Sequence, residues 1–179
     1  PNCFSYHPAK LAIMSILWSP WRMTYVRDHS QQPVIGCVFC DKPAGARDRD
    51  ELILLRGHYN YLMMNLYPYN NGHLLIAPYA HKSSLEDLPA ETLTEMMIMA
   101  NRALGALREA LKPHGFNLGV NLGAAAGAGV AEHVHMHIVP RWGADTNYIT
   151  VTGATRVIPE VLSDTYDRLL GVLNPTAIS

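Results

Sequence analysis

The segment from 133 to 139 alternates histidine with apolar residues and reads His-Val-His-Met-His-Ile-Val. A strand sends successive side chains to opposite faces of a sheet, so the histidines would share one face and the apolar residues the other. The histidines are His133, His135 and His137. We therefore expect a strand with one face in a hydrophobic core and the other face carrying chemistry. The alternative is a row of solvated or hydrogen-bonded histidines without a function.

The remaining apolar patterns divide into short strand-like runs and longer helical ones. Further strands are expected at 52–55, 59–64, 73–77 and 116–122. Apolar residues recur every three or four positions from Pro89 until Lys112 and Pro113, which predicts the longest helix. A second amphipathic helix is expected over 157–173, with Pro159 in its first turn. Strands, a helix, strands and a helix in this order favour an α+β fold.

The length of the chain points to one domain. With 179 residues, 49% of them hydrophobic, it can bury one sizeable core and is short for two. We expect an N-terminal arm over 1–30, a single domain over 31–173 and a tail over 174–179. The apolar run Leu11–Trp18 has no small-residue cleavage pattern after it and is far shorter than the roughly 20 residues that span a bilayer. No membrane association is expected.

Charge and cysteine content limit the partners. The formal net charge of −1, without a cluster of basic residues, argues against a protein that wraps long nucleic acid, while a small anionic ligand remains compatible with it. The 3 cysteines form no disulfide framework, and Cys37 and Cys40 have the C-x-x-C spacing of a metal site or a redox pair. The segment around them, 31–50, reads as a loop that something must order. Reduced thiols favour the cytoplasm.

Three aligned imidazoles suit nucleophilic chemistry at phosphorus. A neutral imidazole is a good nucleophile, and its neighbours can orient it or donate protons. A metal site is the rival interpretation, but three ligands on one strand face point nearly parallel and close poorly around one tetrahedral zinc; one of them can still serve a metal held elsewhere. The small-residue loop Gly123–Gly129 comes just before the histidines, where its N–H groups could cradle a phosphate.

These residues resemble the histidine triad superfamily, whose signature is His-φ-His-φ-His-φ-φ. Besides 133–139, the segments 65–78 and 117–123 are similar to the family's nucleoside-binding strand and the strand before its phosphate loop, and the likeness covers about 50–170. It implies an α+β fold with a five-stranded antiparallel sheet, one long helix and one C-terminal helix, commonly paired as a homodimer. The segments 137–148 and 156–159 look especially like the bacterial diadenosine tetraphosphate phosphorylase branch.

The resemblance also implies site residues. His135 would attack the α-phosphorus and form a nucleotidyl-histidine, His137 would contact the phosphates, and His133 would support the site. The nucleotide-binding residues implied are Asn65 near the ribose, His73 beneath the triad, Asn121 and His137 at the phosphates, and Gly127 and Gly129 in the loop. At the position of Gly129 several hydrolase members carry a hydrogen-bonding Gln or Ser, so this chain would have to use a backbone N–H there.

The resemblance further implies a structural zinc held by Cys37, Cys40, His81 and His133. Two thiolates and two imidazoles suit tetrahedral zinc. Two free thiols are the alternative, and a redox pair is disfavoured because no thioredoxin-like βαβ pattern surrounds them. No organic cofactor is expected.

The expected function is an enzyme that acts on a dinucleoside polyphosphate or a related nucleotide. The second half-reaction decides its class, because water gives hydrolysis, phosphate gives phosphorolysis and a sugar phosphate gives nucleotidyl transfer. A zinc-stabilised nucleotide-binding module with little catalysis is the alternative from another class.

Overall fold

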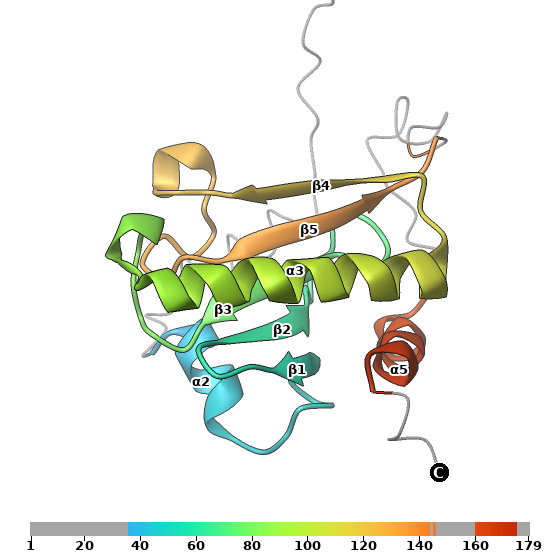
Figure 1. The fold of residues 1–179 in the computed structure, drawn as a ribbon, viewed down its shortest axis with the longest axis horizontal. Coiled ribbons are helices and arrows are strands. Elements are labelled where there is room, and N and C mark those ends of the chain that lie inside the picture. Colours follow the sequence, from blue (N-terminus) through green and yellow to red (C-terminus); the bar gives the residue numbers. More distant parts are fainter. Residues whose placement is uncertain (1–35, 144, 146–159, 175–179) are drawn as a thin grey trace, which may run out of the picture.

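The computed structural model describes residues 36–143, 145 and 160–174, which form an antiparallel sheet with helices on it (Figure 1). The strands are β1 (Ile53–Arg56), β2 (Asn60–Met64), β3 (Leu74–Pro78), β4 (Gly115–Val120) and β5 (Met136–Arg141). Their order in the 5-stranded sheet is β1-β2-β3-β5-β4. The helices are α2 (Val38–Ala44), α3 (Ala90–Leu111) and α5 (Leu162–Leu173), with 3-10 turns η1 (Leu85–Asp87) and η2 (Ala124–Ala126). The expected α+β fold with five antiparallel strands is confirmed.

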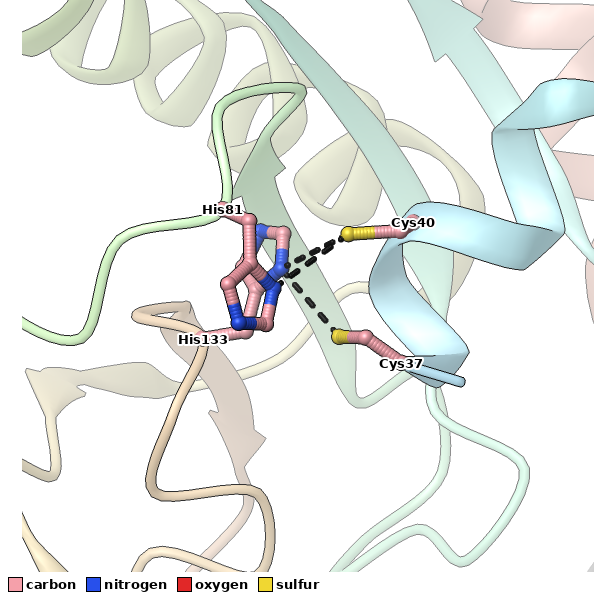
Figure 2. Close-up of side chains that lie close together, drawn as sticks. All are labelled: Cys37, Cys40, His81 and His133. Carbon is pink, nitrogen blue, oxygen red and sulfur yellow. Dashed lines mark hydrogen bonds between the residues drawn. The ribbon is translucent and has the colours of Figure 1, made fainter. Parts of the chain in front are cut away.

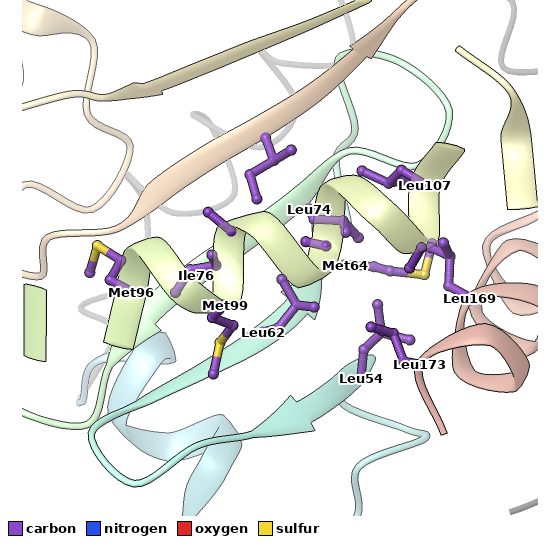
Figure 3. Packing of buried hydrophobic residues seen from close by; sticks show 14 of the residues in the cluster. Leu54, Leu62, Met64, Leu74, Ile76, Met96, Met99, Leu107, Leu169 and Leu173 are labelled. Atoms are coloured by element: carbon purple, nitrogen blue, oxygen red, sulfur yellow. The ribbon is translucent and has the colours of Figure 1, made fainter. Parts of the chain in front are cut away.

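The main core lies between the sheet and the helices α3 and α5. Alternate residues of β2 and β3 supply the sheet side of this core, and Figure 3 shows them facing α3. They are Leu62, Met64, Leu74 and Ile76. The same face receives Val134 and Ile138, which are 2% and 0% exposed. Val134 and Ile138 are therefore core residues, and the partly buried Met136 packs against the same core, as the alternation predicts.

A second, smaller core covers the opposite face of the sheet. Phe39 of α2 packs there with the other set of alternate residues, including Tyr61, Met63, Leu75 and Ala77. Because both faces are covered, every residue of β2 and β3 is buried, which explains why these strands read as continuous apolar runs. Within the described part of the chain, no helix is long and apolar enough to span a membrane.

The segment that was expected to be a loop over 31–50 contains helix α2. This prediction was wrong for Val38–Ala44 because the helix is stabilised by distant contacts rather than by local propensity. The Tyr61 hydroxyl donates to the Phe39 carbonyl at 2.8 Å. The Arg56 guanidinium donates to the Pro43 and Gly45 carbonyls, also at 2.8 Å, and so satisfies carbonyls at the helix C-terminus.

The strands β1, β2 and β3 differ from their predicted bounds by one residue at one or both ends, and three other elements shift more. The strand expected over 133–139 is β5, which runs from Met136 through Pro140 to Arg141, so His133 and His135 lie just before it. The strand expected over 116–122 is β4 and ends at Val120. The helix expected over 157–173 is α5, which begins at Leu162 after an extended Val161. Pro159, and the parts of the expected arm and tail over 1–30 and 175–179, lie outside the described residues.

A single carboxylate ties α3 to the β1–β2 turn. Glu95 accepts hydrogen bonds from the backbone N–H groups of His58, Tyr59 and Asn60 at 2.7, 2.8 and 2.8 Å. The Asn60 side-chain amide donates to the same carboxylate at 2.9 Å. At Gly57 an added Cβ would come within 2.8 Å of a Glu95 oxygen, so this turn requires glycine for close approach.

Candidate active site

The three histidines lie on the side of the sheet opposite the main core, His137 in β5 and the other two just before it. His133 and His135 are 0% and 5% exposed, and His137 is half-buried on β5. The rings of His135 and His137 are 4.9 Å apart, centroid to centroid. His137 pairs across the sheet with Leu75 on β3 and Gly119 on β4, so the triad lies near the middle of the sheet rather than on an edge.

The protonation of the central ring follows from one hydrogen bond. His135 Nδ1 lies 2.8 Å from the His133 carbonyl oxygen. A carbonyl only accepts, so Nδ1 carries the proton and Nε2 of the neutral ring keeps its lone pair. Burial lowers the pKa of His135, while the bond to this carbonyl opposes that change. The ring is therefore held neutral with Nε2 as its basic atom.

A chain of hydrogen bonds sets the tautomer of His137. The backbone N–H of Tyr69 donates to His73 Nδ1 at 3.0 Å, so His73 carries its ring proton on Nε2. His73 Nε2 lies 3.0 Å from His137 Nδ1 and donates to it. In its neutral form His137 then has its proton on Nε2, as a donor.

The predicted nucleotide residues His73 and Asn65 lie in this chain. His73 is 1% exposed, which puts it beneath the triad. Burial first, and then the charges of His137 and His135, lower its pKa from 6.5 to about 3. The Asn65 side-chain amide lies 3.3 Å from His73 Nδ1, and its oxygen accepts from the Tyr67 N–H at 3.0 Å. Tyr69 was missed in the sequence, although besides its backbone N–H its ring packs on His73 and His137, with centroids 4.6 and 5.8 Å apart.

The remaining predicted nucleotide residues lie at the end of β4 and in the loop after it. Asn121 directly follows Val120, which pairs with Met136, so it leaves the sheet at the level of His135. Gly127 follows η2 and has φ +84°, a left-handed conformation that favours glycine. Gly129 comes two residues later in the same partly exposed loop. All three residues lie in the segment that connects β4 to the triad.

Four potential metal ligands converge beside the triad, as Figure 2 shows. They are Cys37 just before α2, Cys40 in α2, His81 from the segment after β3, and His133. Their ligand atoms all lie within 4.8 Å of one another. His133 Nε2 is 2.9 Å from the Pro78 carbonyl and must donate to it, which leaves the Nδ1 lone pair directed at the cysteines. The donor set fits a tetrahedral metal such as zinc.

Cys40 requires a nearby cation to serve as a thiolate. Cys37 Sγ lies 3.3 Å from His133 Nδ1, and Cys40 Sγ lies 3.4 Å from His81 Nδ1. Burial, the hydrogen bond with Cys37 and nearby negative charges raise the pKa of Cys40 to about 11. A positive charge in this cluster would favour the thiolate form that binds metals.

Phe39 was also missed as a site residue. Its ring centroid is 4.5 Å from that of His135 and 5.4 Å from that of His133. An available signal was its place between the two cysteines, as a large apolar residue in a segment otherwise rich in turn-forming residues.

Comparisons with known proteins agree with this geometry. A family model described as the HIT domain matches residues 47–143. An AP-4-A phosphorylase from Mycobacterium tuberculosis is 43% identical over 155 residues, which cover 83% of this chain and 79% of that protein. An adenosine 5'-monophosphoramidase from Saccharomyces cerevisiae is 34% identical over 106 residues, covering 59% of this chain and 63% of that protein.

A solved structure has a similar fold. It is described as a Zn-bound histidine triad family protein from Mycobacterium smegmatis, with a TM-score of 0.57 and 28% identity over 68% of this chain and 83% of that one. The matched family model, the relatives and the triad geometry together show that this chain belongs to the histidine triad family, the proteins that carry the HIT domain.

Proposed function

We propose that this protein is an enzyme that cleaves phosphoanhydride bonds in nucleotides by transferring a nucleotidyl group to His135. The observation that carries the proposal is the state of the His135 ring, whose Nδ1–H is bound to the His133 carbonyl while Nε2 keeps its lone pair. A neutral imidazole with an oriented lone pair is suited to attack phosphorus. The phosphorylase and phosphoramidase activities named for two relatives support the same reaction class.

The proposed reaction has two balanced steps. His135 Nε2 attacks the α-phosphorus of a dinucleoside polyphosphate, a P–N bond forms, and the bond from that phosphorus to the bridging oxygen breaks to release a nucleoside polyphosphate. An acceptor oxygen then attacks the same phosphorus, the P–N bond breaks, and its electron pair returns to Nε2. The nucleotidyl group leaves on the acceptor, and His135 is regenerated.

The surrounding residues would position the phosphates. His137 has Nε2–H as a donor once His73 occupies its Nδ1, and such a donor stabilises charge that develops on phosphate oxygens. We propose that Asn121 and the loop at Gly127 and Gly129 also contact the phosphates, and that Asn65 holds the ribose. The left-handed backbone at Gly127 supports this role, since it allows backbone N–H groups to approach an anion.

We propose phosphate as the preferred acceptor. Any oxygen nucleophile in line can attack a nucleotidyl-histidine, so positioning and water exclusion decide the outcome. The support is the similarity to a named AP-4-A phosphorylase. With diadenosine tetraphosphate and millimolar phosphate, phosphorolysis yields ADP and ATP, whereas hydrolysis yields AMP and ATP. If AMP dominates at every phosphate concentration, the acceptor is water and the proposed nucleophile still stands.

We propose that zinc occupies the cluster of Cys37, Cys40, His81 and His133. The donor set and the convergence within 4.8 Å support it, as does the Zn-bound relative of similar fold. When bound, the zinc would supply a structural link between α2 and the triad segment. Metal analysis of protein purified without added zinc should find about one equivalent per chain. Near-zero content with both thiols freely titratable would contradict the proposal.

We also propose that the protein is cytoplasmic, because reduced ligand thiols of this kind persist in that compartment.

We propose that two copies of the chain pair through α3 and β4. The exposed apolar side chains on these elements and after β4 support this: Met97 and Ile98 are 50% and 57% exposed, and Leu118 and Leu122 are each 41% exposed. β4 is also an edge strand of the sheet. An apolar patch beside a strand edge usually marks an interface.

For the domain organisation we propose an arm over 1–30, one histidine triad domain over 31–173 and a tail over 174–179. The family match over 47–143 lies within the proposed domain. Helix α2 precedes the matched residues and α5 follows them, and both helices pack onto the same sheet.

A further inference from the structure

We infer that Phe39 is a positioning residue for the nucleophile, and that through it helix α2, which adjoins the candidate metal cluster, sets the orientation of the His135 ring. This inference rests on the proposed function, because it concerns how His135 is held for attack. It assigns a role to a residue that is neither a metal ligand nor a member of the triad.

Phe39 packs directly against the nucleophile. Its side chain is 5% exposed and packs against His135, with the ring planes tilted by 32° and the centroids 4.5 Å apart. The hydrogen bond from Nδ1 to the His133 carbonyl holds one atom of the His135 ring, yet a single hydrogen bond leaves the ring some freedom to tilt. A large flat side chain against one face removes this freedom, and so directs Nε2.

The position of Phe39 in turn depends on the position of helix α2. The Phe39 backbone lies between Cys37 and Cys40, two of the four candidate metal ligands. Its carbonyl also accepts a buried hydrogen bond of 2.8 Å from the Tyr61 hydroxyl on β2. The helix has 7 residues and no side-chain cap, so these contacts hold it in place.

The candidate metal cluster and the nucleophile share a second connection, through His133. His133 supplies a candidate ligand atom through Nδ1 and, through its own carbonyl, the acceptor for His135 Nδ1–H. Movement of the cluster would therefore reach His135 by two routes, through the Phe39 ring and through the His133 backbone. Catalysis depends steeply on the orientation of reacting groups, so a shift of this kind affects the chemical step more than substrate binding.

The test compares Phe39→Leu with wild-type protein, both zinc-loaded, and uses Ile53→Val as the matched control. Ile53 belongs to the same small core and is 1% exposed, but it lies on β1. Steady-state kinetics with diadenosine tetraphosphate and phosphate give kcat and KM, and ¹⁵N NMR of the imidazoles reports the tautomer and environment of His135. In Phe39→Leu we expect kcat to fall at least about tenfold with KM changed less than about threefold.

The NMR readout separates positioning from general loosening of the core. In Phe39→Leu the ¹⁵N signals of His135 should move from a single Nδ1–H tautomer towards an averaged pattern, whereas Ile53→Val should keep wild-type signals and kcat. Wild-type kcat and His135 signals in Phe39→Leu, or equal losses in both variants, would overturn the inference. If Phe39→Leu does not fold, Tyr61→Phe, which releases the Phe39 carbonyl, decides by the same signals: a shift supports the inference and wild-type signals overturn it.

Failure of the proposed function would look different from failure of this inference. If wild-type His135 never carries a nucleotidyl group, the function fails even though the NMR comparison still reports the contact. If wild-type protein is labelled at His135 and Phe39→Leu is labelled equally fast, only the inference fails.

Discussion

His73 is a buried base whose hydrogen bonds require it to be neutral. Its Nδ1 accepts from the Tyr69 N–H, so a proton on Nδ1 would break that bond and add a charge in a site where the side chain is 1% exposed. His137 and His135 face the same region and add repulsion when charged. The arrangement that sets the His137 tautomer therefore makes the fold sensitive to acid.

We expect His73 to lower stability as the pH falls. Its pKa is about 3 in the folded chain, below the ordinary 6.5. The neutral state it requires is freely available above pH 6.5, so its contribution is fully present there and is lost between about pH 6.5 and 3. The slope of the urea-unfolding free energy against pH gives the number of protons taken up on unfolding. In His73→Gln this number should be lower than in wild type by up to about one proton in this window. His58→Gln, at an exposed position, serves as the control. Identical slopes for wild type and His73→Gln would contradict this account.

Among the elements, α3 depends on Glu95 for its connection to the first hairpin. Four donors reach one carboxylate, three of them consecutive backbone N–H groups. Burial raises the pKa of Glu95, but the hydrogen bonds from Asn60 and the backbone outweigh burial and lower it. The negative charge is therefore part of the folded structure.

Replacement of Glu95 by Gln should destabilise the fold by about 1 to 3 kcal/mol, because charge-assisted hydrogen bonds are lost. In addition, the side-chain NH2 of Gln would face N–H donors and could not accept from them. Glu109→Gln, at an exposed position on the same helix, should change stability by less than about 0.5 kcal/mol. Chemical denaturation of the three proteins measures the difference. Equal midpoints for both variants would show that the turn does not depend on this charge.

The sequence predicted elements well where the pattern was local and poorly where distant contacts decide. The alternation at His133–Val139 predicted which side chains enter the core, and the spacing after Pro89 predicted α3. Helix α2 could not be read from its own sequence, because Tyr61 and Arg56 stabilise it from the sheet. The late start of β5 has a similar cause, since Val134 donates to the Lys82 carbonyl rather than to a neighbouring strand.

The candidate site shows the same division. Residue types and spacing, together with the family resemblance, indicated the histidines and the four clustered ligands, which the fold brings together. The tautomer of each ring was not predictable, because it depends on carbonyl and N–H groups of Pro78, His133 and Tyr69. Backbone groups carry no side-chain signal, and their positions follow only from the folded chain.

At the scale of the whole molecule, the proposed dimer predicts an effect of charge on the exposed apolar patch. Ile98→Glu puts a carboxylate at a 57%-exposed position of α3, where pairing would require its desolvation. Light scattering at micromolar concentration should give a dimer for wild type and a monomer for Ile98→Glu. Val161→Glu, at a 63%-exposed position before α5, should remain dimeric. A monomeric wild-type protein would refute the proposed pairing.

The central claim is that the intact protein passes through a covalent nucleotidyl-His135 state. The most direct test is to mix wild-type protein with diadenosine tetraphosphate without added phosphate, quench it in denaturant at neutral or alkaline pH within milliseconds to seconds, and measure the mass of the whole chain. The account predicts one added adenylyl group, located by peptide mapping on His135 and removed when phosphate is added. His135→Ala should show no adduct and no turnover, with nucleotide affinity within about tenfold of wild type, because the nucleophile acts mainly in the transition state. An unmodified wild-type chain together with substantial turnover by His135→Ala would contradict the claim.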